Sequence, residues 1–303
     1  MFNTFKLFSI VGIALVAWET NGQAQNILIK DGQKIAFLGD SITAQGVEHP
    51  SGYVQLVVLG LKVNGIKVTI IGAGVGGNKS NQMLAREDAD VIDQKPDWMT
   101  ISCGVNDIYG QLALNLYRQN MIHIIDKAQA ANIKVIILTA TMITEDQSAE
   151  LNQKLIPYNS FLRQLAKDKK CPLADLNADM QAAVLASGGG PKTRRGGSIL
   201  TNGGVHMNAL GDQVMAIGLL KTMGLNADQL QKAQESWLDL PKICEVDLNG
   251  GLTVRQLQQL DALAVKQNRP TSELLGELVA KSLAPALPVL ESSASGEKRV
   301  DVH

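Results

Sequence analysis

A short apolar segment that ends in Gly39-Asp40-Ser41 constrains the fold of this chain more than any other feature. Residues 35–38 are Ile, Ala, Phe and Leu, and apolar residues at helical spacing follow over residues 52–63. This pattern predicts a buried parallel strand that delivers Ser41 to the carboxyl edge of a sheet, where ligands bind in open α/β folds. The serine is there either a helix cap or a nucleophile, and the tripeptide alone does not separate the two.

Further apolar segments alternate with helical patterns along the chain, which is typical of an α/β domain with a parallel sheet. Expected strands cover residues 35–38, 67–71, 98–103, 133–140 and 172–176, with the last at an edge of the sheet. Expected helices cover residues 52–63, 115–131, 148–169, 181–186 and 209–223. Pro157 lies inside the third of these helices, and we expect it to break or kink that helix.

Two loops follow expected strands and bring polar groups to the same edge as Ser41. The glycine-rich loop over residues 72–78 is a poor dinucleotide fingerprint, but its glycines let a backbone N–H point into a site. Asn106 follows the strand over residues 98–103, and its amide can donate to a developing oxyanion, a contribution of about 10²–10³ in rate. The alternative for Asn106 is a turn residue with no catalytic part.

The loop of residues 200–208 adds a histidine before the last helix, and with it the chain resembles the SGNH (GDSL) hydrolase family. The matching motifs are Gly39-Asp40-Ser41, Gly74-x-x-Gly77, Gly104-x-Asn106-Asp107 and Gly204-Val205-His206, in the order of the family. The resemblance covers about residues 30–224 and is carried by the ordered set rather than by any single motif.

This resemblance implies a flavodoxin-like three-layer α/β/α sandwich with a parallel sheet, and an enzyme that hydrolyses carboxylic esters without a metal or cofactor. It implies that Ser41 is the nucleophile and that His206 is the general base. It also implies an oxyanion hole formed by the Ser41 N–H, the Gly77 N–H and the Asn106 side chain. The substrate is then an acetyl or acyl ester of a carbohydrate, a small lipid or an aryl alcohol.

The chemistry of these residue types is consistent with the implied roles. A serine hydroxyl is a poor nucleophile until a base within hydrogen-bond reach takes its proton, and histidine has a suitable pKa near neutral pH. Asp40 and Asp107 also lie in the motifs, but in the family these positions look structural, and we expect both to brace turns.

The chain departs from the family at the position three residues before His206, where Gly203 stands in place of an aspartate. That carboxylate would fix the histidine tautomer and stabilise the imidazolium. Three interpretations compete: a working enzyme whose His206 is oriented by Asn202 or a backbone carbonyl, a slow enzyme, and a catalytically inactive ligand-binding or carbohydrate-binding protein that keeps the pocket.

The N-terminus has the pattern of a secretory signal peptide over residues 1–24. Lys6 precedes an apolar run over residues 7–18, and small residues flank the expected cleavage point before Gln25. The run is too short to span a bilayer comfortably, and an uncleaved anchor is the alternative. We therefore expect a secreted or periplasmic protein with no stable membrane insertion after cleavage.

We expect a hydrolase domain over residues 25–224, a helical appendage over residues 225–285 and a disordered tail over residues 286–303. The appendage includes a strand over residues 242–249 and helices over residues 227–238, 253–267 and 271–283, and it is a candidate homodimer contact. The formal net charge of the 303 residues is -1, which gives no electrostatic case for binding nucleic acid.

Overall fold

The computed structural model describes residues 27–187, 198–238, 240, 254–267, 269 and 271–283. The chain divides into two compact units, Met1–Lys242 and Ile243–His303. Several predictions lie outside the described residues: the signal peptide over residues 1–24, the strand over residues 242–249 and the tail over residues 286–303. In the described ranges, no helix has the length and apolar character needed to cross a membrane.

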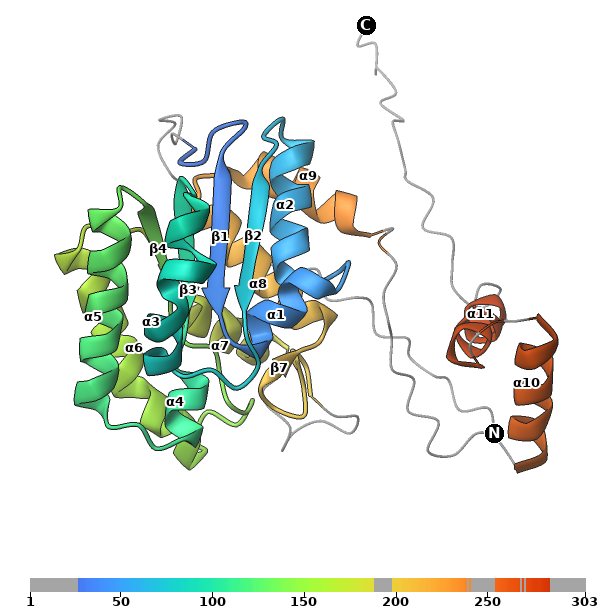
Figure 1. The fold of residues 1–303 in the computed structure, drawn as a ribbon. Helices are drawn as coiled ribbons and strands as arrows, with labels where there is room; N and C mark the ends of the chain where they lie inside the picture. Colours follow the sequence, from blue (N-terminus) through green and yellow to red (C-terminus); the bar gives the residue numbers. More distant parts are fainter. Residues whose placement is uncertain are drawn as a thin grey trace, which may run out of the picture. The chain divides into compact units, whose positions relative to one another are not determined.

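The first unit is built on a sheet of five parallel strands in the order β2-β1-β3-β4-β5 (Figure 1). The strands are β1 Lys34–Gly39, β2 Thr69–Gly74, β3 Trp98–Ser102, β4 Lys134–Leu138 and β5 Leu173–Ala174. The expected parallel α/β class is confirmed, and the expected edge strand is β5. Because all five strands are parallel, the loops after Gly39, Gly74 and Ser102 leave the sheet at one edge.

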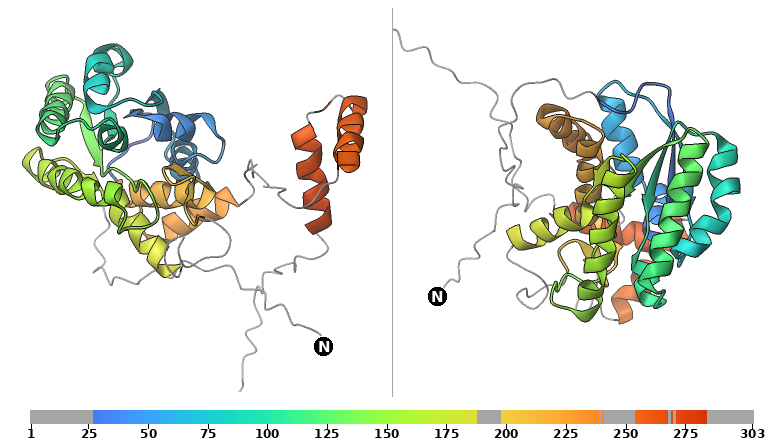
Figure 2. Two further views of the ribbon diagram at one scale, coloured as in Figure 1. Left: turned by 90° about the horizontal axis from the view of Figure 1, so that it is seen from below. Right: turned by 90° about the vertical axis from the view of Figure 1, so that its left-hand side faces the viewer.

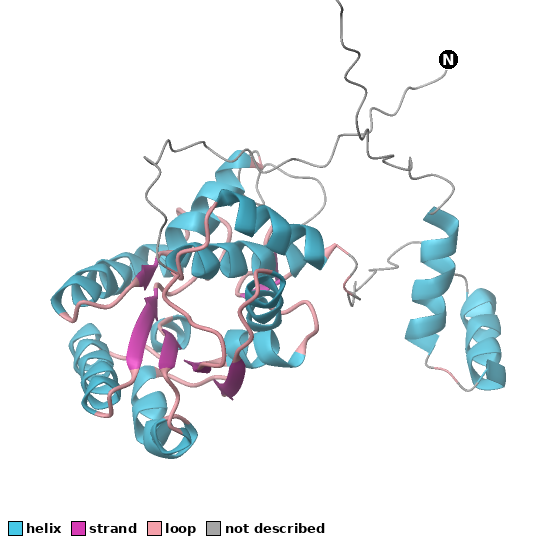
Figure 3. Ribbon diagram, turned by 90° about the horizontal axis from the view of Figure 1, so that it is seen from above, coloured by secondary structure: helices cyan, strands magenta, loops and turns pink. Residues whose placement is uncertain are grey.

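Helices cover both faces of this sheet and complete a three-layer α/β/α sandwich (Figures 2 and 3). One layer contains α1 Ser41–Glu48, α2 Tyr53–Val63, α7 Leu176–Ala186, α8 Ala209–Thr222 and α9 Ala227–Trp237. The other contains α3 Ser80–Asp90, α5 Leu114–Ala130 and α6 Glu150–Asp168, with the short α4 Val105–Tyr109 against α6. A 3₁₀ turn, η1 Ile92–Gln94, precedes β3.

The core explains why the first strand has an uninterrupted apolar run. Residues 35–38 of β1 are fully buried, because β1 has helices on both faces and paired strands on both sides. β2 lies at the edge and is half-exposed along most of its length. Burial on two faces requires a continuous apolar run, whereas an edge strand tolerates alternation.

Helix α6 corrects one prediction. We expected Pro157 to break or kink the helix over residues 148–169, and the expected break is wrong because α6 runs from Glu150 to Asp168 as one helix. Pro157 is exposed, so the backbone carbonyl that loses its partner four residues earlier, at the exposed Gln153, faces solvent. Buried neighbours such as Leu155 and Tyr158 hold the helix against the core.

Helix α9 corrects the domain boundary that we expected at residue 224. Leu230, Ala233 and Trp237 of α9 are buried, and Trp237 Nε1 donates to the Leu56 carbonyl of α2 at 3.1 Å. α9 therefore belongs to the first unit, and the division lies after Lys242. The sequence predicted a helix over residues 227–238 but not which surface it covers.

The second unit contains α10 Val254–Gln267 and α11 Thr271–Leu283, in close agreement with the two predicted helices. Leu260, Ala264 and Leu274 form its small buried cluster. Two ion pairs, from Arg269 to Glu273 at 2.8 Å and to Glu277 at 2.6 Å, tie the turn to α11. A hairpin of this size is below the length at which isolated domains usually fold without a partner or a crosslink.

Candidate active site

Ser41 is the first residue of α1 and lies directly after β1, at the carboxyl edge of the sheet. Its Oγ lies 2.9 Å from Nε2 of His206, and both residues are half-buried. This distance lies within the range at which a histidine can accept a serine hydroxyl proton. The structure thus brings together the serine and the histidine that the sequence singled out from opposite ends of the domain.

Asp40 shapes the turn that presents Ser41. Its carboxylate accepts the Ile42 N–H at 2.9 Å as the N-cap of α1, and it also accepts the Asn106 amide at 3.3 Å. Its side chain is 1% exposed, and this burial raises its pKa to about 6. Gly39 before it is required, because a Cβ there would lie 2.1 Å from Thr43 Oγ1. These contacts agree with a bracing part for Asp40.

Asn106 lies on the same edge, in the first turn of α4. Its Nδ2 donates to the Asn78 carbonyl at 3.2 Å and to Asp40 at 3.3 Å. Gly104 before it has φ 141°, and a Cβ there would meet Ala140 Cβ at 2.7 Å, so only glycine fits the entry to α4. The two contacts fix the amide beside the turn that carries Ser41.

The glycine loop after β2 passes beside the serine. A Cβ on Gly76 would lie 4.0 Å from Ser41 Cβ, and the Val75 N–H donates to the Gly39 carbonyl at 3.1 Å. Gly77 has φ 73° and open space where a Cβ would stand. The loop therefore exposes backbone at Gly76 and Gly77 with no side chain in the way.

Arg86 of α3 is a supporting residue that sequence reasoning missed. Its guanidinium donates to the Gly39 carbonyl at 2.8 Å, to Asn78 Oδ1 at 2.8 Å and to Asp90 at 2.7 Å. It thereby links the end of β1 to Asn78 of the glycine loop, whose carbonyl accepts the Asn106 amide. No sequence signal marks Arg86, because the Gly39 carbonyl that it binds is a backbone acceptor 47 residues away.

Asp107 is fully buried behind the site. Its carboxylate accepts the Ser80 N–H at 3.0 Å, the Ser80 hydroxyl at 2.6 Å and the Cys103 thiol at 3.3 Å. These contacts join the starts of α3 and α4, as expected for a residue that braces a turn. The same burial beside Asp107 raises the pKa of the Cys103 thiol, chiefly through desolvation.

His206 lies on a two-stranded antiparallel ladder, β6 Thr201–Asn202 and β7 His206–Met207. Gly203 and Gly204 form its turn with φ 68° and 108°. Asn202 is directly opposite His206, but its side chain is exposed and no hydrogen bond joins it to the imidazole. Within the described parts of the chain, the imidazole makes no hydrogen bond to a carboxylate. The orienting part of Asn202 remains a prediction.

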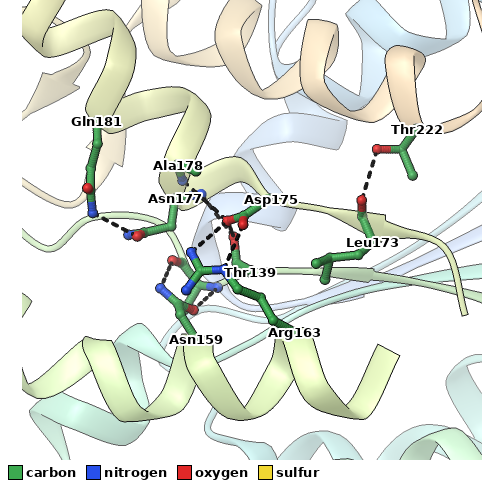
Figure 4. Close-up of polar contacts among 10 residues, drawn as sticks. Thr139, Asn159, Arg163, Leu173, Asp175, Asn177, Ala178, Gln181 and Thr222 are labelled. Carbon is green, nitrogen blue, oxygen red and sulfur yellow. Dashed lines mark hydrogen bonds and ion pairs between the residues drawn. The ribbon is translucent and has the colours of Figure 1, made fainter. Parts of the chain in front are cut away.

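A polar cluster supports the ends of β4 and β5 on the side of α6 (Figure 4). Asp175, which caps α7, accepts from Arg163 at 2.7 Å and 2.9 Å and from the Thr139 hydroxyl at 3.1 Å. The ion pair with Arg163 and these hydrogen bonds lower the pKa of Asp175 against the effect of its burial. Asn159 holds the backbone of Ala140 with two bonds of 2.9 Å and 3.0 Å.

Among the aromatic residues, only some are available to a ligand. Tyr53 is fully buried, and its hydroxyl lies 3.0 Å from Thr43 Oγ1. Trp98 is buried at the start of β3, at the opposite edge of the sheet. Tyr109 is 50% exposed and lies one helical turn beyond Asn106 on α4.

Over the described ranges, no group of three His, Cys, Asp or Glu side chains is arranged to hold a metal ion.

Comparisons with known proteins agree with this geometry. A serine and a histidine within hydrogen-bond distance at the carboxyl edge of a parallel sheet can act as nucleophile and base in acyl transfer. Residues 37–214 match the GDSL-like Lipase/Acylhydrolase family. The chain belongs to this family and is a hydrolase of ester bonds.

Its similar relatives include acetylxylan esterases. The acetylxylan esterase of Geobacillus stearothermophilus is 25% identical over 219 residues, which are 65% of this chain and 96% of that protein. The solved structure of the acetyl xylan esterase AlAXEase is 34% identical with a TM-score of 0.57, and the match covers 62% of this chain and 98% of that one. The structure of Axe2 from Geobacillus stearothermophilus, 24% identical with a TM-score of 0.57, covers 66% and 97% and shows the same fold.

Catalytic mutants of Axe2 have also been solved, with a serine, a histidine or an aspartate replaced by alanine. In that enzyme the aspartate lies three residues before the histidine. The corresponding spacing in this chain leads from His206 back to Gly203. This chain therefore lacks the spacing of three residues between an aspartate and the histidine that Axe2 has.

Proposed function

We propose that this protein is an exported serine esterase that uses Ser41 as nucleophile and His206 as general base. The observation that carries the proposal is the distance of 2.9 Å between Ser41 Oγ and His206 Nε2 at the carboxyl edge of the sheet. Membership of an ester-hydrolase family supports the class of reaction. Export is proposed from the N-terminal pattern over residues 1–24.

The reaction starts when Ser41 Oγ attacks the ester carbonyl and its proton passes to His206 Nε2. The carbonyl oxygen becomes an oxyanion, for which we propose three donors: the Ser41 N–H, the Gly77 N–H and the Asn106 amide. His206 then protonates the leaving alcohol, and an acyl-Ser41 intermediate remains. Water, activated by the same histidine, releases the carboxylic acid and restores the serine.

The two contacts of Asn106 support its part in this scheme. Bonds of 3.2 Å and 3.3 Å are long for an amide donor and therefore weak. Exchanging them for a hydrogen bond to an oxyanion costs little free energy. A charged acceptor forms a stronger hydrogen bond than the Asn78 carbonyl does. The amide is thus held in place in the free enzyme and stabilises the negative charge that develops on the carbonyl oxygen in the transition state.

For the substrate we propose an acetyl ester on a carbohydrate, such as an acetylated xylo-oligosaccharide. The support is the recurrence of acetylxylan esterases among the relatives and the exposed ring of Tyr109, one helical turn from Asn106. An exposed aromatic ring beside a site offers an apolar face to a sugar. We further propose that the second unit mediates homodimer formation, because among its described side chains the helix pair buries only Leu260, Ala264 and Leu274.

The substrate proposal is tested by measuring acetate release from acetylated xylo-oligosaccharides and hydrolysis of p-nitrophenyl esters of rising acyl length. We expect kcat/KM to be highest for acetyl esters and to fall as the acyl chain grows. A preference for long acyl chains would contradict the carbohydrate acetyl ester. No hydrolysis of any ester, with retained binding of oligosaccharides, would favour the alternative that Gly203 raises, a catalytically inactive carbohydrate-binding protein.

A further inference from the structure

We infer that Glu145 is a positioning residue for His206 and carries out, through the backbone, the orienting task of the carboxylate that Gly203 replaces. This inference rests on the proposed function of the Ser41–His206 pair. Glu145 lies in the segment between β4 and α6, outside the family motifs of the sequence. It is 2% exposed, so its carboxylate is inside the protein and requires partners.

Those partners all belong to the segment that leads into the His206 ladder. Glu145 Oε2 accepts the Ile199 N–H at 2.6 Å, and Oε1 accepts the Leu200 N–H at 2.6 Å. Oε1 also accepts the Thr201 N–H at 3.0 Å and the Thr201 hydroxyl at 3.1 Å. One carboxylate thus binds three consecutive backbone N–H groups, each through a charge-assisted hydrogen bond.

The segment that carries Glu145 is itself fixed to α6. Asn152 Oδ1 accepts the Ile143 N–H at 2.9 Å, and its Nδ2 donates to the carbonyls of Thr144 at 2.7 Å and Asp146 at 2.8 Å. These bonds grip the backbone on both sides of Glu145. The carboxylate is therefore a fixed point of the sandwich rather than a mobile side chain.

Short connections lead from the bound backbone to the imidazole. Thr201 pairs with Met207 and Asn202 with His206, so the strand that Glu145 binds is the ladder partner of the strand that carries His206. Asn208 closes the base of the ladder, because its N–H donates to the Leu200 carbonyl at 2.9 Å and its Nδ2 to the Ile199 carbonyl at 3.0 Å. Each residue that Glu145 binds thus also pairs with Met207 or bonds to Asn208, the two residues that directly follow His206.

The ladder depends on these contacts for its position. Each of its strands has only two residues, too few to form a buried face of their own. Gly204 packs against the segment before Glu145, where a Cβ would lie 2.9 Å from the Ile143 carbonyl. A shift of about 1 Å in a catalytic group can cost about 10²-fold in rate. Loss of the Glu145 carboxylate should therefore displace His206 and lower the catalytic rate.

Glu145→Gln is the variant that tests this inference. Glutamine keeps the length and one acceptor oxygen, but it removes the charge and sets an NH₂ group against an N–H that had an acceptor. We expect kcat for p-nitrophenyl acetate to fall at least about 10-fold with KM within about 2-fold, by the displacement argument. The matched control is Glu87→Gln, which makes the same change at a buried carboxylate of α3 that has no hydrogen-bond partner, and it should leave kcat within about 2-fold.

Two further readouts separate positioning from a general loss of stability. The rate at which a serine-directed phosphonate labels Ser41 should fall in parallel with kcat, at a temperature well below the melting transition of each variant. Gly203→Asp, introduced into the Glu145→Gln background, should recover part of kcat because it supplies a carboxylate three residues before His206. A purely structural part for Glu145 would lower the melting temperature without the fall in labelling rate or the recovery.

The outcomes also separate this inference from the proposed function. An inactive Ser41→Ala together with a folded Glu145→Gln whose kcat is within 2-fold of the parent would overturn the inference and leave the proposed function standing. Unchanged turnover by Ser41→Ala would instead overturn the proposed function. If Glu145→Gln does not fold, Glu145→Asp, which keeps the charge but shortens the reach, should show the same fall in kcat, and parental kcat in that variant would overturn the inference.

Discussion

Ser41 Oγ and His206 Nε2 lie 2.9 Å apart, although 165 residues separate them along the chain. The position of the serine is set by β1 and by the Asp40 cap of α1, whereas the position of the histidine is set by a short ladder without a core of its own. The serine is thus held by regular structure and the histidine by polar contacts. Changes on the histidine side should therefore have the larger effects on catalytic geometry for a given loss of stability.

Asn106→Ala tests the proposed oxyanion hole. We expect kcat to fall by about 10²–10³ with little change in KM, because the amide acts on charge that develops only in the transition state. Steady-state kinetics with p-nitrophenyl acetate measures both constants. The control is Asn64→Ala at the C-terminal end of α2, whose amide donates to the Gly60 carbonyl. An increase in KM alone for Asn106→Ala would mean that the amide only binds substrate.

Gly203→Asp tests whether the missing carboxylate limits the enzyme. An anion beside His206 favours the imidazolium that forms in the transition state, so kcat should rise. Gly203 has φ 68°, and nothing lies within 4 Å of where a Cβ would stand, so the cost is backbone strain of about 1 kcal/mol or more rather than a clash.

Gly203→Ala is the matched control for that strain, because it adds the Cβ without the carboxylate. Both variants should show the same fall in melting temperature, and only the aspartate should raise kcat. A folded Gly203→Asp enzyme with unchanged kcat would show that His206 is already fully oriented in the parent. Asn202→Ala then examines the residue opposite the histidine.

The strands and the residues at their ends could be predicted from the sequence, because burial on two faces leaves a continuous apolar run such as residues 35–38. Ser41 and Asn106 each follow such a strand and therefore converge on one edge. Arg86 and Glu145 could not be predicted, because they bind backbone groups 47 to 56 residues away and no residue pattern records such partners. The same holds for α9, because the sequence predicts the helix but not that it packs against α2.

Tyr109→Ala tests the carbohydrate part of the proposed substrate. If the exposed ring lies against the sugar, KM for an acetylated xylo-oligosaccharide should rise about 5- to 10-fold, in line with the roughly 1 kcal/mol of an aromatic contact. KM for p-nitrophenyl acetate, which has no sugar, should not change. Tyr109→Phe keeps the ring and should behave like the parent. Equal effects of Tyr109→Ala on both substrates would remove Tyr109 from sugar recognition.

Glu87 should give the protein a distinctive dependence of stability on pH. Its carboxylate is fully buried in α3 without a hydrogen bond, and Lys127 Nζ lies 3.8 Å away. Desolvation raises the pKa of Glu87 from 4.5 to about 8, despite the opposing effect of Lys127. Between these values the folded state binds a proton that the unfolded state has released, so the free energy of unfolding falls as the pH rises.

Glu87→Gln removes this titration and should flatten the fall between pH 4.5 and about 8. One pKa unit corresponds to about 1.4 kcal/mol, so the difference from the parent at pH 8 should be on the order of a few kcal/mol. Urea unfolding at several pH values gives the free energies. Glu235→Gln, the same change at an exposed glutamate of α9, is the control and should leave the slope in place. A parallel pH dependence of Glu87→Gln and the parent would show that Glu87 stays ionised.

The central claim is that Ser41 is a nucleophile activated by His206, and covalent labelling by a serine-directed phosphonate measures it most directly. The parent protein should gain the mass of one phosphonyl group, and peptide mapping should place that group on Ser41. Ser41→Ala should remain unlabelled, and folded His206→Ala should label at least about 10²-fold more slowly, as expected on loss of a general base. A folded parent protein that gains no label, or a His206→Ala variant that labels at the parental rate, would contradict the account.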